Sequence, residues 1–146
     1  MRREIRQRNV LFLDQDNARL SQMAEAVAKY LGPPKVRIFS AGVTPGNIPA
    51  PVRKVMQELG INMSAQNSKS VDQVPLDEID LIVSFAGADK NCAALPARAK
   101  VKQWAIASSR AAQNNDFAAL STLREERDEI NKRVFALFMD YWRNLT

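Results

Sequence analysis

Apolar runs alternate along this chain with segments whose apolar residues recur at helical spacing. Four runs are typical of strands that are buried in a sheet: residues 10–13, 36–42, 79–85 and 100–106. Three segments have helical periodicity: residues 21–31, residues 52–59, and a long segment from about residue 116 to the C-terminus. Gly32 with two prolines ends the first helix, and Gly60 ends the second. Residues 44–51 hold three prolines and a glycine, which predicts a loop.

Strands that alternate with helices predict an α/β fold in three layers, with a four-stranded parallel sheet flanked by helices on both faces and a long C-terminal helix. The length suits one domain over residues 1–146, with residues 1–8 as a basic, flexible N-terminus. Along the last helix an apolar stripe is interrupted by Arg127, whose methylenes could cover it while the charged head reaches solvent. The stripe consists of Phe117, Leu120, Leu123, Ile130, Val134, Leu137, Phe138 and Tyr141.

The composition is that of an ordinary globular protein, with 46% hydrophobic and 25% charged residues. No run of about 18 apolar residues predicts a membrane span, and no secretory signal is recognised, so a cytoplasmic location is the default expectation. Cys92 is the only cysteine, which excludes an intramolecular disulfide. Since the chain has no histidine, a structural zinc site is not expected either, and we expect no metal and no cofactor.

The net charge of +5 and the pI near 9.7 would suit an acidic partner. Much of the excess, however, comes from the arginines near the N-terminus: Arg2, Arg3, Arg6 and Arg8. A solvated basic terminus is therefore favoured over a nucleic-acid-binding arm, and no nucleic-acid-binding motif is found.

The segment from Val10 to Val27 contains an apolar strand, a short polar loop and the start of a helix. Such a loop presents unpaired backbone N–H groups that favour an anion. Asp14 and Asp16 oppose this, because two unit charges about 4 Å apart repel by roughly 1 to 4 kcal/mol. We therefore expect an Asp14 or Asp16 carboxylate to accept backbone N–H bonds and to close the loop from within.

Two other interpretations of these carboxylates are possible. Apolar residues followed by Asp-x-Asp resemble the opening motif of haloacid-dehalogenase-type phosphohydrolases, in which the first Asp is the nucleophile, the second is an acid/base and Mg²⁺ is bound. Alternatively, Asp14 and Asp16 could ligate a hard cation. Both are less favoured, since no acidic magnesium pair is found further along the chain.

The chain as a whole resembles the low-molecular-weight protein tyrosine phosphatases and, within them, the thioredoxin-coupled arsenate reductases. The similarity runs from Val10 to Val134. It rests on segments in the family's order: VLFLDQDNARLSQMAEAVA, FSAG, VRKVMQELGINMSAQNSKSVDQV, DEIDLIVSF, CAALP, KVKQWAI and RDEINKRV.

The same resemblance shows how this chain departs from the family. The family signature is Cys-x5-Arg, a thiolate nucleophile followed by an arginine that clamps the oxyanion. Here Asp14 occupies the nucleophile position, Leu20 the arginine position, Asp16 that of a glycine and Ala18 that of a helper serine. The candidate ligand-binding loop is Asp14, Gln15, Asp16, Asn17, Ala18, Arg19, Leu20 and Ser21, of which Asn17 and Ser21 match the family. Arg19 is one position away, and one position turns a helical side chain by about 100°.

The other positions implied by the resemblance are also altered. The phosphatases' general acid falls on Ser108, and of the reductases' three relay cysteines the last matches Cys92, while the middle one falls at Phe85 or Ala86. We therefore expect no catalytic residue and interpret the chain as a catalytically inactive homologue that acts as a binding or regulatory module. The alternatives are an active hydrolase that uses Asp14 with a divalent metal, or a residual arsenate-reductase-like redox role through Cys92. Enzyme activity is thus an open question, with its absence favoured.

The partner is expected to be an unidentified protein or a small ligand. Self-association is a second candidate, because four aromatic residues crowd the end of the last helix: Phe135, Phe138, Tyr141 and Trp142. Packing of these residues on the protein's own sheet is favoured over a homodimer. Cys92 is interpreted as a small buried residue, with an exposed thiol as the alternative.

Overall fold

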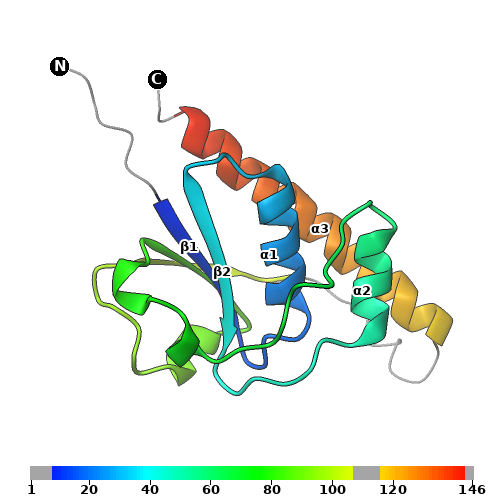
Figure 1. The fold of residues 1–146 in the computed structure, drawn as a ribbon, viewed down its shortest axis with the longest axis horizontal. Coiled ribbons are helices and arrows are strands. Elements are labelled where there is room, and N and C mark those ends of the chain that lie inside the picture. Colours follow the sequence, from blue (N-terminus) through cyan, green and yellow to red (C-terminus); the bar gives the residue numbers. More distant parts are fainter. Residues whose placement is uncertain (1–7, 107–115, 144–146) are drawn as a thin grey trace.

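The computed structural model describes residues 8–106 and 116–143 (Figure 1). The strands are β1 (Arg8–Asp14), β2 (Val36–Gly42), β3 (Leu81–Phe85) and β4 (Lys100–Trp104). The helices are α1 (Leu20–Leu31), α2 (Ala50–Gln57) and α3 (Asp116–Arg143). Three short 3₁₀ helices complete the described part: η1 (Val71–Gln73), η2 (Leu76–Glu78) and η3 (Ala88–Asn91).

The strands form one parallel sheet in the order β2-β1-β3-β4, which confirms the predicted four-stranded parallel sheet. Some predicted bounds were wrong by a few residues. β3 begins at Leu81 rather than at Ile79, because Ile79 ends the turn of η2. β4 ends at Trp104 rather than at residue 106, and α2 begins two residues earlier than predicted, at Ala50.

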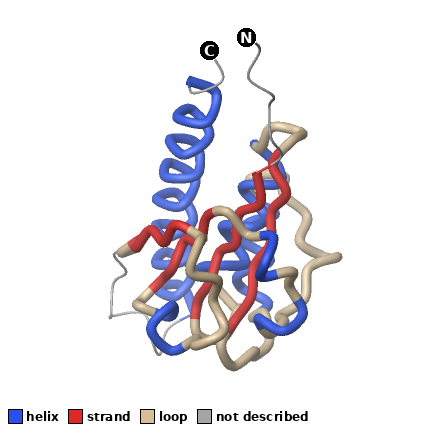
Figure 2. The backbone as a smooth tube through the Cα atoms, turned by 90° about the vertical axis from the view of Figure 1, so that its left-hand side faces the viewer, coloured by secondary structure: helices blue, strands red, loops and turns tan. Residues whose placement is uncertain are grey.

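Successive residues of β1 point to opposite faces of the sheet and belong to two different apolar clusters. Val10 and Phe12 pack with the three α-helices, whereas Leu11 and Leu13 pack with residues of η1, η2 and η3. Seen from the side of the 3₁₀ helices, α1 and α3 lie behind the sheet (Figure 2). The sheet is therefore flanked on both faces, as predicted. The α-helices share one face, and within the described residues the 3₁₀ helices and loops cover the other.

Helix α3 is confirmed as the long C-terminal helix, and its stripe is buried at Leu123, Ile130, Val134 and Phe138. The side chain of Arg127 is also buried, and the prediction that its head reaches solvent was wrong. Its Nη1 donates to the carbonyl of Val55, at 2.8 Å, and to Glu58 Oε1, also at 2.8 Å. The arginine therefore ties the end of α2 to α3.

Glu58 accepts hydrogen bonds from Arg124 as well as from Arg127. The Arg124 hydrogen bond is the main cause that lowers the pKa of the Glu58 carboxyl to about 2.

Of the aromatic cluster, Phe138 is buried in the protein's own core, as favoured, and Phe135 is exposed. The side chains of Phe117, Tyr141 and Trp142 lie outside the part that the structure describes. Among the described helices, none is both long and apolar enough to span a membrane.

Candidate functional site

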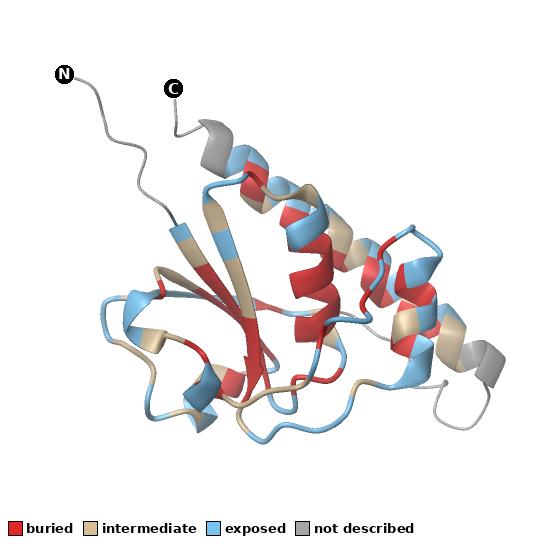
Figure 3. Cartoon of the chain, in the orientation of Figure 1, coloured by how far each residue is buried: buried red, intermediate tan, exposed pale blue. Residues whose placement is uncertain are grey.

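The candidate loop lies at the carboxyl end of β1, at the lower edge of the sheet in Figure 3, where the buried core reaches the loops. This is the edge at which parallel α/β sheets bind ligands. Asp14 is the last residue of β1, and α1 begins at Leu20. Within the loop, Asn17 and Ala18 are buried, whereas Gln15, Asp16 and Arg19 are exposed.

The carboxylate of Asp14 is turned into the loop and is only 7% exposed. Its Oδ1 accepts the backbone N–H of Asn17 at 2.5 Å, and its Oδ2 accepts the backbone N–H of Ser21 at 3.0 Å. The prediction that an aspartate of the loop accepts backbone N–H groups is confirmed for Asp14. Burial raises the pKa of the Asp14 carboxyl above its ordinary 3.8, while hydrogen bonds from Ser21 and Asn17 act in the opposite direction.

Asn17 is the centre of the loop's hydrogen-bond network and is fully buried. Its Nδ2 donates to the hydroxyls of Ser21 and Ser40, each at 2.9 Å. Its Oδ1 accepts the side-chain amide of Gln22 at 2.8 Å and the backbone N–H of Lys69 at 2.9 Å. Asn17 also has a positive φ of 51°, a conformation that asparagine tolerates better than most residues.

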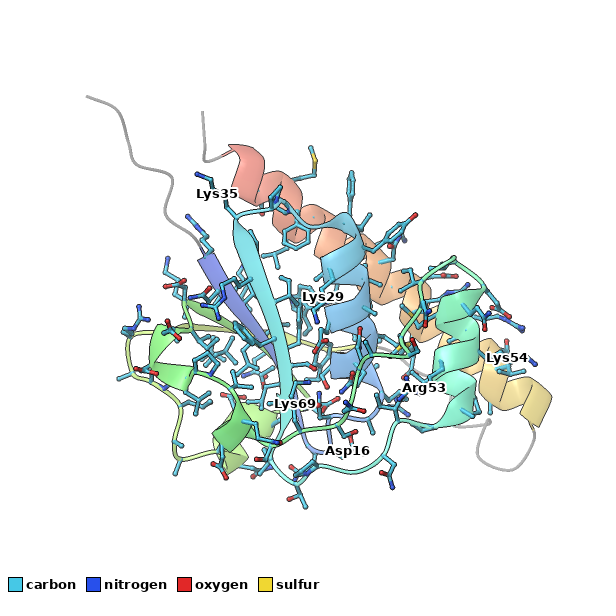
Figure 4. All side chains as sticks on the ribbon, in the orientation of Figure 1. Asp16, Lys29, Lys35, Arg53, Lys54 and Lys69 are labelled. Atoms are coloured by element: carbon cyan, nitrogen blue, oxygen red, sulfur yellow. The ribbon has the colours of Figure 1, made fainter. Side chains whose placement is uncertain are left out.

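The segment that leaves α2 crosses over the loop and closes it. The hydroxyl of Ser68 donates to the carbonyl of Asn17 at 2.7 Å. Gln66 donates to Oε1 of Gln22 at 2.7 Å, and Arg53 donates to the carbonyl of Gln66 at 3.1 Å. Figure 4 shows Asp16 below Arg53 and Lys69 at this end of the molecule. The loop is therefore covered by protein rather than open on this side.

Glu25 adds a buried charge behind this network and is 3% exposed. It accepts the hydroxyl of Ser40 through Oε1, and its Oε2 lies 2.8 Å from Nζ of Lys29. Nζ of Lys69 lies 3.4 Å from Oε1 of Glu25. The carboxylate is thus paired with two ammonium groups, as a buried charge requires.

Neither Leu20, which occupies the family's arginine position, nor the preceding Arg19 has a contact with the Asp14 carboxylate among those that the structure shows. Leu20 packs against the hydrophobic core. Arg19 forms an ion pair with Glu126, with Nε 3.4 Å from Oε1. The expectation that Arg19 does not replace the clamp agrees with this contact.

Cys92 lies directly after η3 and is half-buried, with its thiol free. It packs at the border of the apolar cluster on the η1–η3 side, so neither the fully buried nor the fully exposed interpretation is correct. Its neighbour Asn91 donates from Nδ2 to Oε1 of Gln15, at 3.2 Å. The cysteine segment is therefore tied to the candidate loop.

The middle relay cysteine was predicted at Phe85, which is the last residue of β3, or at Ala86, which begins the following turn. Phe85 is fully buried in the core, and Ala86 is exposed with a positive φ of 54°. Beyond the turn, Asp89 accepts hydrogen bonds from Gln103 and Ser84, both at 2.7 Å, and the Gln103 bond is the main cause that lowers its pKa. Ser108 lies outside the described residues.

The loop packs so closely on β2 that it requires a glycine at position 42. A Cβ at Gly42 would lie 2.7 Å from the backbone N of Asn17 and 2.7 Å from the carbonyl carbon of Asp16. We expect Gly42→Ala to lower the free energy of unfolding by about 2 kcal/mol, because backbone atoms must shift. The matched control is Gly46→Ala, whose Cβ meets nothing closer than 3.6 Å. Urea unfolding measures both, and equal stabilities would contradict this packing.

Sequence reasoning missed most of the polar residues that close the site. Gln22, Ser68 and Lys69 form hydrogen bonds with Asn17 of the loop. Gln66 reaches the loop only through Gln22, and Glu25 only through Ser40 and Lys69. A weak signal was present, because Gln22 and Glu25 flank the apolar residues of α1 on a face that the periodicity places inside. Among the described residues, no group of three or more acidic, cysteine or histidine side chains could hold a metal ion.

The four-stranded parallel sheet, with a strand–loop–helix turn at its carboxyl edge, places the chain in the class of phosphatase-like α/β folds. Within that class, the chain belongs to the low molecular weight phosphotyrosine protein phosphatase family, whose family profile matches residues 9–141.

Arsenate reductases are among the relatives of this chain. The chain is 35% identical to an arsenate reductase of Halalkalibacterium halodurans over 127 residues, which are 86% of this chain and 91% of the relative. It is 34% identical to an arsenate reductase of Bacillus subtilis, over 86% of this chain and 91% of that one. A solved structure of an arsenate reductase in the phosphate binding state matches with a TM-score of 0.71 and 27% identity, and covers 91% of this chain and 98% of that chain.

An arginine phosphatase from Geobacillus stearothermophilus has the same fold, with a TM-score of 0.77 at 20% identity, over 94% of each chain. The resemblance to the family is therefore confirmed. The interpretation of the chain as a catalytically inactive binding or regulatory module was wrong, because the relatives over most of the chain are arsenate reductases and nothing in them points to inactivity. The altered signature positions are four sites in a chain that is similar to arsenate reductases over 86% of its length.

Proposed function

We propose that this chain takes part in arsenate reduction, with Cys92 as its reacting thiol and an external dithiol protein supplying the remaining sulfur atoms. The observation that carries the proposal is the place of Cys92, a free, half-buried thiol in a segment tied to the candidate loop by the Asn91–Gln15 hydrogen bond. By its resemblance, Cys92 matches the last relay cysteine of the reductases. The 35% identical relative is an arsenate reductase.

A single protein thiol can complete this chemistry when a dithiol partner is present. The Cys92 thiolate displaces water from arsenate and forms a bond between sulfur and As(V). A thiolate of the partner then attacks Sγ of Cys92, and the electron pair of the sulfur–arsenic bond stays on arsenic, which leaves as arsenite, As(III). The resulting mixed disulfide is resolved by the partner's second thiol, which frees Cys92 and leaves the partner oxidised. The sum converts arsenate and a dithiol into arsenite, a disulfide and water.

The hydrolase alternative has less support. An aspartyl nucleophile needs a free carboxylate oxygen, whereas both oxygens of Asp14 accept backbone N–H groups. The chemistry also calls for a divalent metal, and the described residues offer no cluster of ligands. A working thiol fits a reducing compartment, so we also propose a cytoplasmic location.

The test is arsenate-dependent consumption of NADPH by the full chain, coupled through thioredoxin and thioredoxin reductase. We expect Cys92→Ser to lower the rate on the order of 1000-fold, to the background of the coupling system, because the reacting sulfur is gone. The matched control, Ala93→Ser, alters the neighbouring exposed residue and is expected to leave the rate unchanged.

The alternatives give different results in the same series. An Asp14→Asn variant with an aryl phosphate, with and without Mg²⁺, reports the hydrolase mechanism. Absence of arsenate turnover in the unmodified chain, or full turnover in the Cys92→Ser variant, would refute the proposal.

A further inference from the structure

Strand β4 forms an edge of the sheet, and in the described part of the chain it pairs only with β3. The backbone N–H of Lys100 donates toward the β3 side, to the carbonyl of Asp80, at 3.0 Å. Because backbone groups alternate in direction along a parallel strand, the N–H and C=O groups of Val101 and Gln103 point away from β3. Val101 is also 43% exposed, which is high for an apolar strand residue. With respect to the described residues, this edge therefore has backbone groups available for pairing with another strand.

Beside this edge lies an open cleft of about 180 Å³ between β4 and α3. Its lining combines an aromatic wall, aliphatic side chains and charges: Lys102, Trp104, Arg133, Ala136, Leu137 and Asp140. A cavity of roughly 150 Å³ holds a benzene molecule, so the cleft has room for one apolar side chain. Trp104 is itself 8% exposed and rests on Phe12 and Phe85, which makes this wall rigid.

Basic side chains outnumber acidic ones on the strand and in the cleft lining, with Lys100, Lys102 and Arg133 against Asp140. Lys100 and Lys102 alternate on the exposed strand, and within the described residues no ion pair joins either of them to an acidic side chain. Arg133 adds a guanidinium that is held in place by Glu129, at 3.0 Å, and by the carbonyl of Ala105, at 3.0 Å. A second copy of this chain would bring lysines opposite lysines, which destabilises strand pairing. The edge suits an acidic strand instead.

We propose that β4 and the neighbouring cleft are a docking surface for an extended acidic peptide segment of a partner protein. The segment adds a strand to β4 through the outward groups of Val101 and Gln103. Its acidic residues face Lys100 and Lys102, and one apolar side chain enters the cleft against Trp104. Backbone pairing with side-chain pockets is a recurring mode of peptide recognition. The proposal goes beyond the arsenate chemistry and does not depend on it.

The test uses a fluorescein-labelled peptide that alternates glutamate with valine and has a central leucine, titrated with the full chain and followed by fluorescence anisotropy. Val101→Pro removes an outward N–H without loss of a bond to β3, and an edge strand tolerates proline. We expect it to weaken binding about tenfold or more, and Lys102→Glu to do the same. Lys54→Glu, an exposed lysine on α2, is the matched control and is expected to change the dissociation constant by less than about twofold.

Circular dichroism checks that each variant is folded, and the Lys102→Glu variant leaves the backbone untouched. The amide NMR signals of Val101 and Gln103 are expected to shift on binding. Failure of the acidic peptide to bind, equal binding of a peptide with lysine in place of glutamate, or full binding by Val101→Pro would overturn the proposal. Displacement of the peptide by a single-stranded oligonucleotide, with no effect of Val101→Pro, would point to a general anion surface and overturn it as well.

Discussion

Replacing Asn17 with glycine is expected to lower the free energy of unfolding by about 3 to 5 kcal/mol. The buried side chain of Asn17 makes hydrogen bonds to Ser21, Ser40 and Gln22, which are buried, and to Lys69, which is half-buried. Its removal leaves several buried polar groups without partners, and each such loss costs about 1 kcal/mol or more. Glycine accepts the positive φ of this position, so the effect reports the side chain alone.

Alanine at the same position distinguishes the energetic contribution of the backbone conformation from that of the side chain. Asn17→Ala is expected to cost about 1 kcal/mol more than Asn17→Gly, because alanine is strained in the left-handed region. Urea unfolding of both variants measures the difference. As a control, Asn91→Ala loses one exposed hydrogen bond and is expected to cost less than about 1 kcal/mol. Equal costs for Asn17→Gly and Asn91→Ala would show that the Asn17 network contributes little.

Removing the carboxylate of Asp14 is expected to have the second largest effect. Asp14→Ala leaves the N–H groups of Asn17 and Ser21 without an acceptor, which costs about 2 to 4 kcal/mol for two buried donors. An oxyanion that binds those donors in the folded state alone would restore stability by mass action. We therefore expect phosphate, added at constant ionic strength, to raise the unfolding midpoint of Asp14→Ala and to leave the unmodified chain unchanged. An equal response of the two proteins would contradict an internal anion at Asp14.

The pH dependence provides an independent check on Asp14. Its pKa is raised in the folded protein, mainly by burial, so the folded state holds this proton more tightly than the unfolded state. The contribution of Asp14 to stability is therefore most favourable at low pH and declines as pH rises from its ordinary value of 3.8 through the raised folded value. Relative to Asp14→Asn, which does not titrate, the unmodified chain should lose stability over that interval. A difference that stays constant with pH would show that the Asp14 pKa is not raised.

The predictions made from single elements were the most accurate. The apolar run of β1 and the spacing of α1 and α3 predicted those elements because burial of a continuous stripe imposes its period on the sequence. An aspartate cap of the loop was predictable for a similar reason, because a strand–loop–helix leaves amides that a nearby acceptor satisfies. The sequence left Asp14 and Asp16 as alternatives for it. The positive φ at Asn17, in contrast, could not be predicted from the residue types of the loop.

Tertiary packing decided the features that the local pattern could not. The sequence predicted that the charged head of Arg127 reaches solvent, because its partners could not be recognised from the local pattern. These partners, Val55 and Glu58, lie about 70 residues earlier at the end of α2. That the three α-helices share one face of the sheet was also not predictable from local patterns. The periodicity of α2 shows that one side of the helix is buried, but not which face of the sheet it packs against. The prediction of an inactive protein was wrong for a different reason. It rested on four altered positions, whereas the chain as a whole is similar to arsenate reductases.

The sequence by itself determined the order of strands and helices, the family resemblance and the presence of one thiol, because these depend on residue type and short-range spacing. Only the tertiary structure decided that Asp14 rather than Asp16 accepts the loop's amides, that Ser68 and Lys69 cover the loop, and that the Cys92 segment contacts it through Gln15. The contacts of Ser68, Lys69 and Gln15 join residues that are distant along the chain, and their hydrogen bonds form only when folding brings donor and acceptor within about 3 Å of each other.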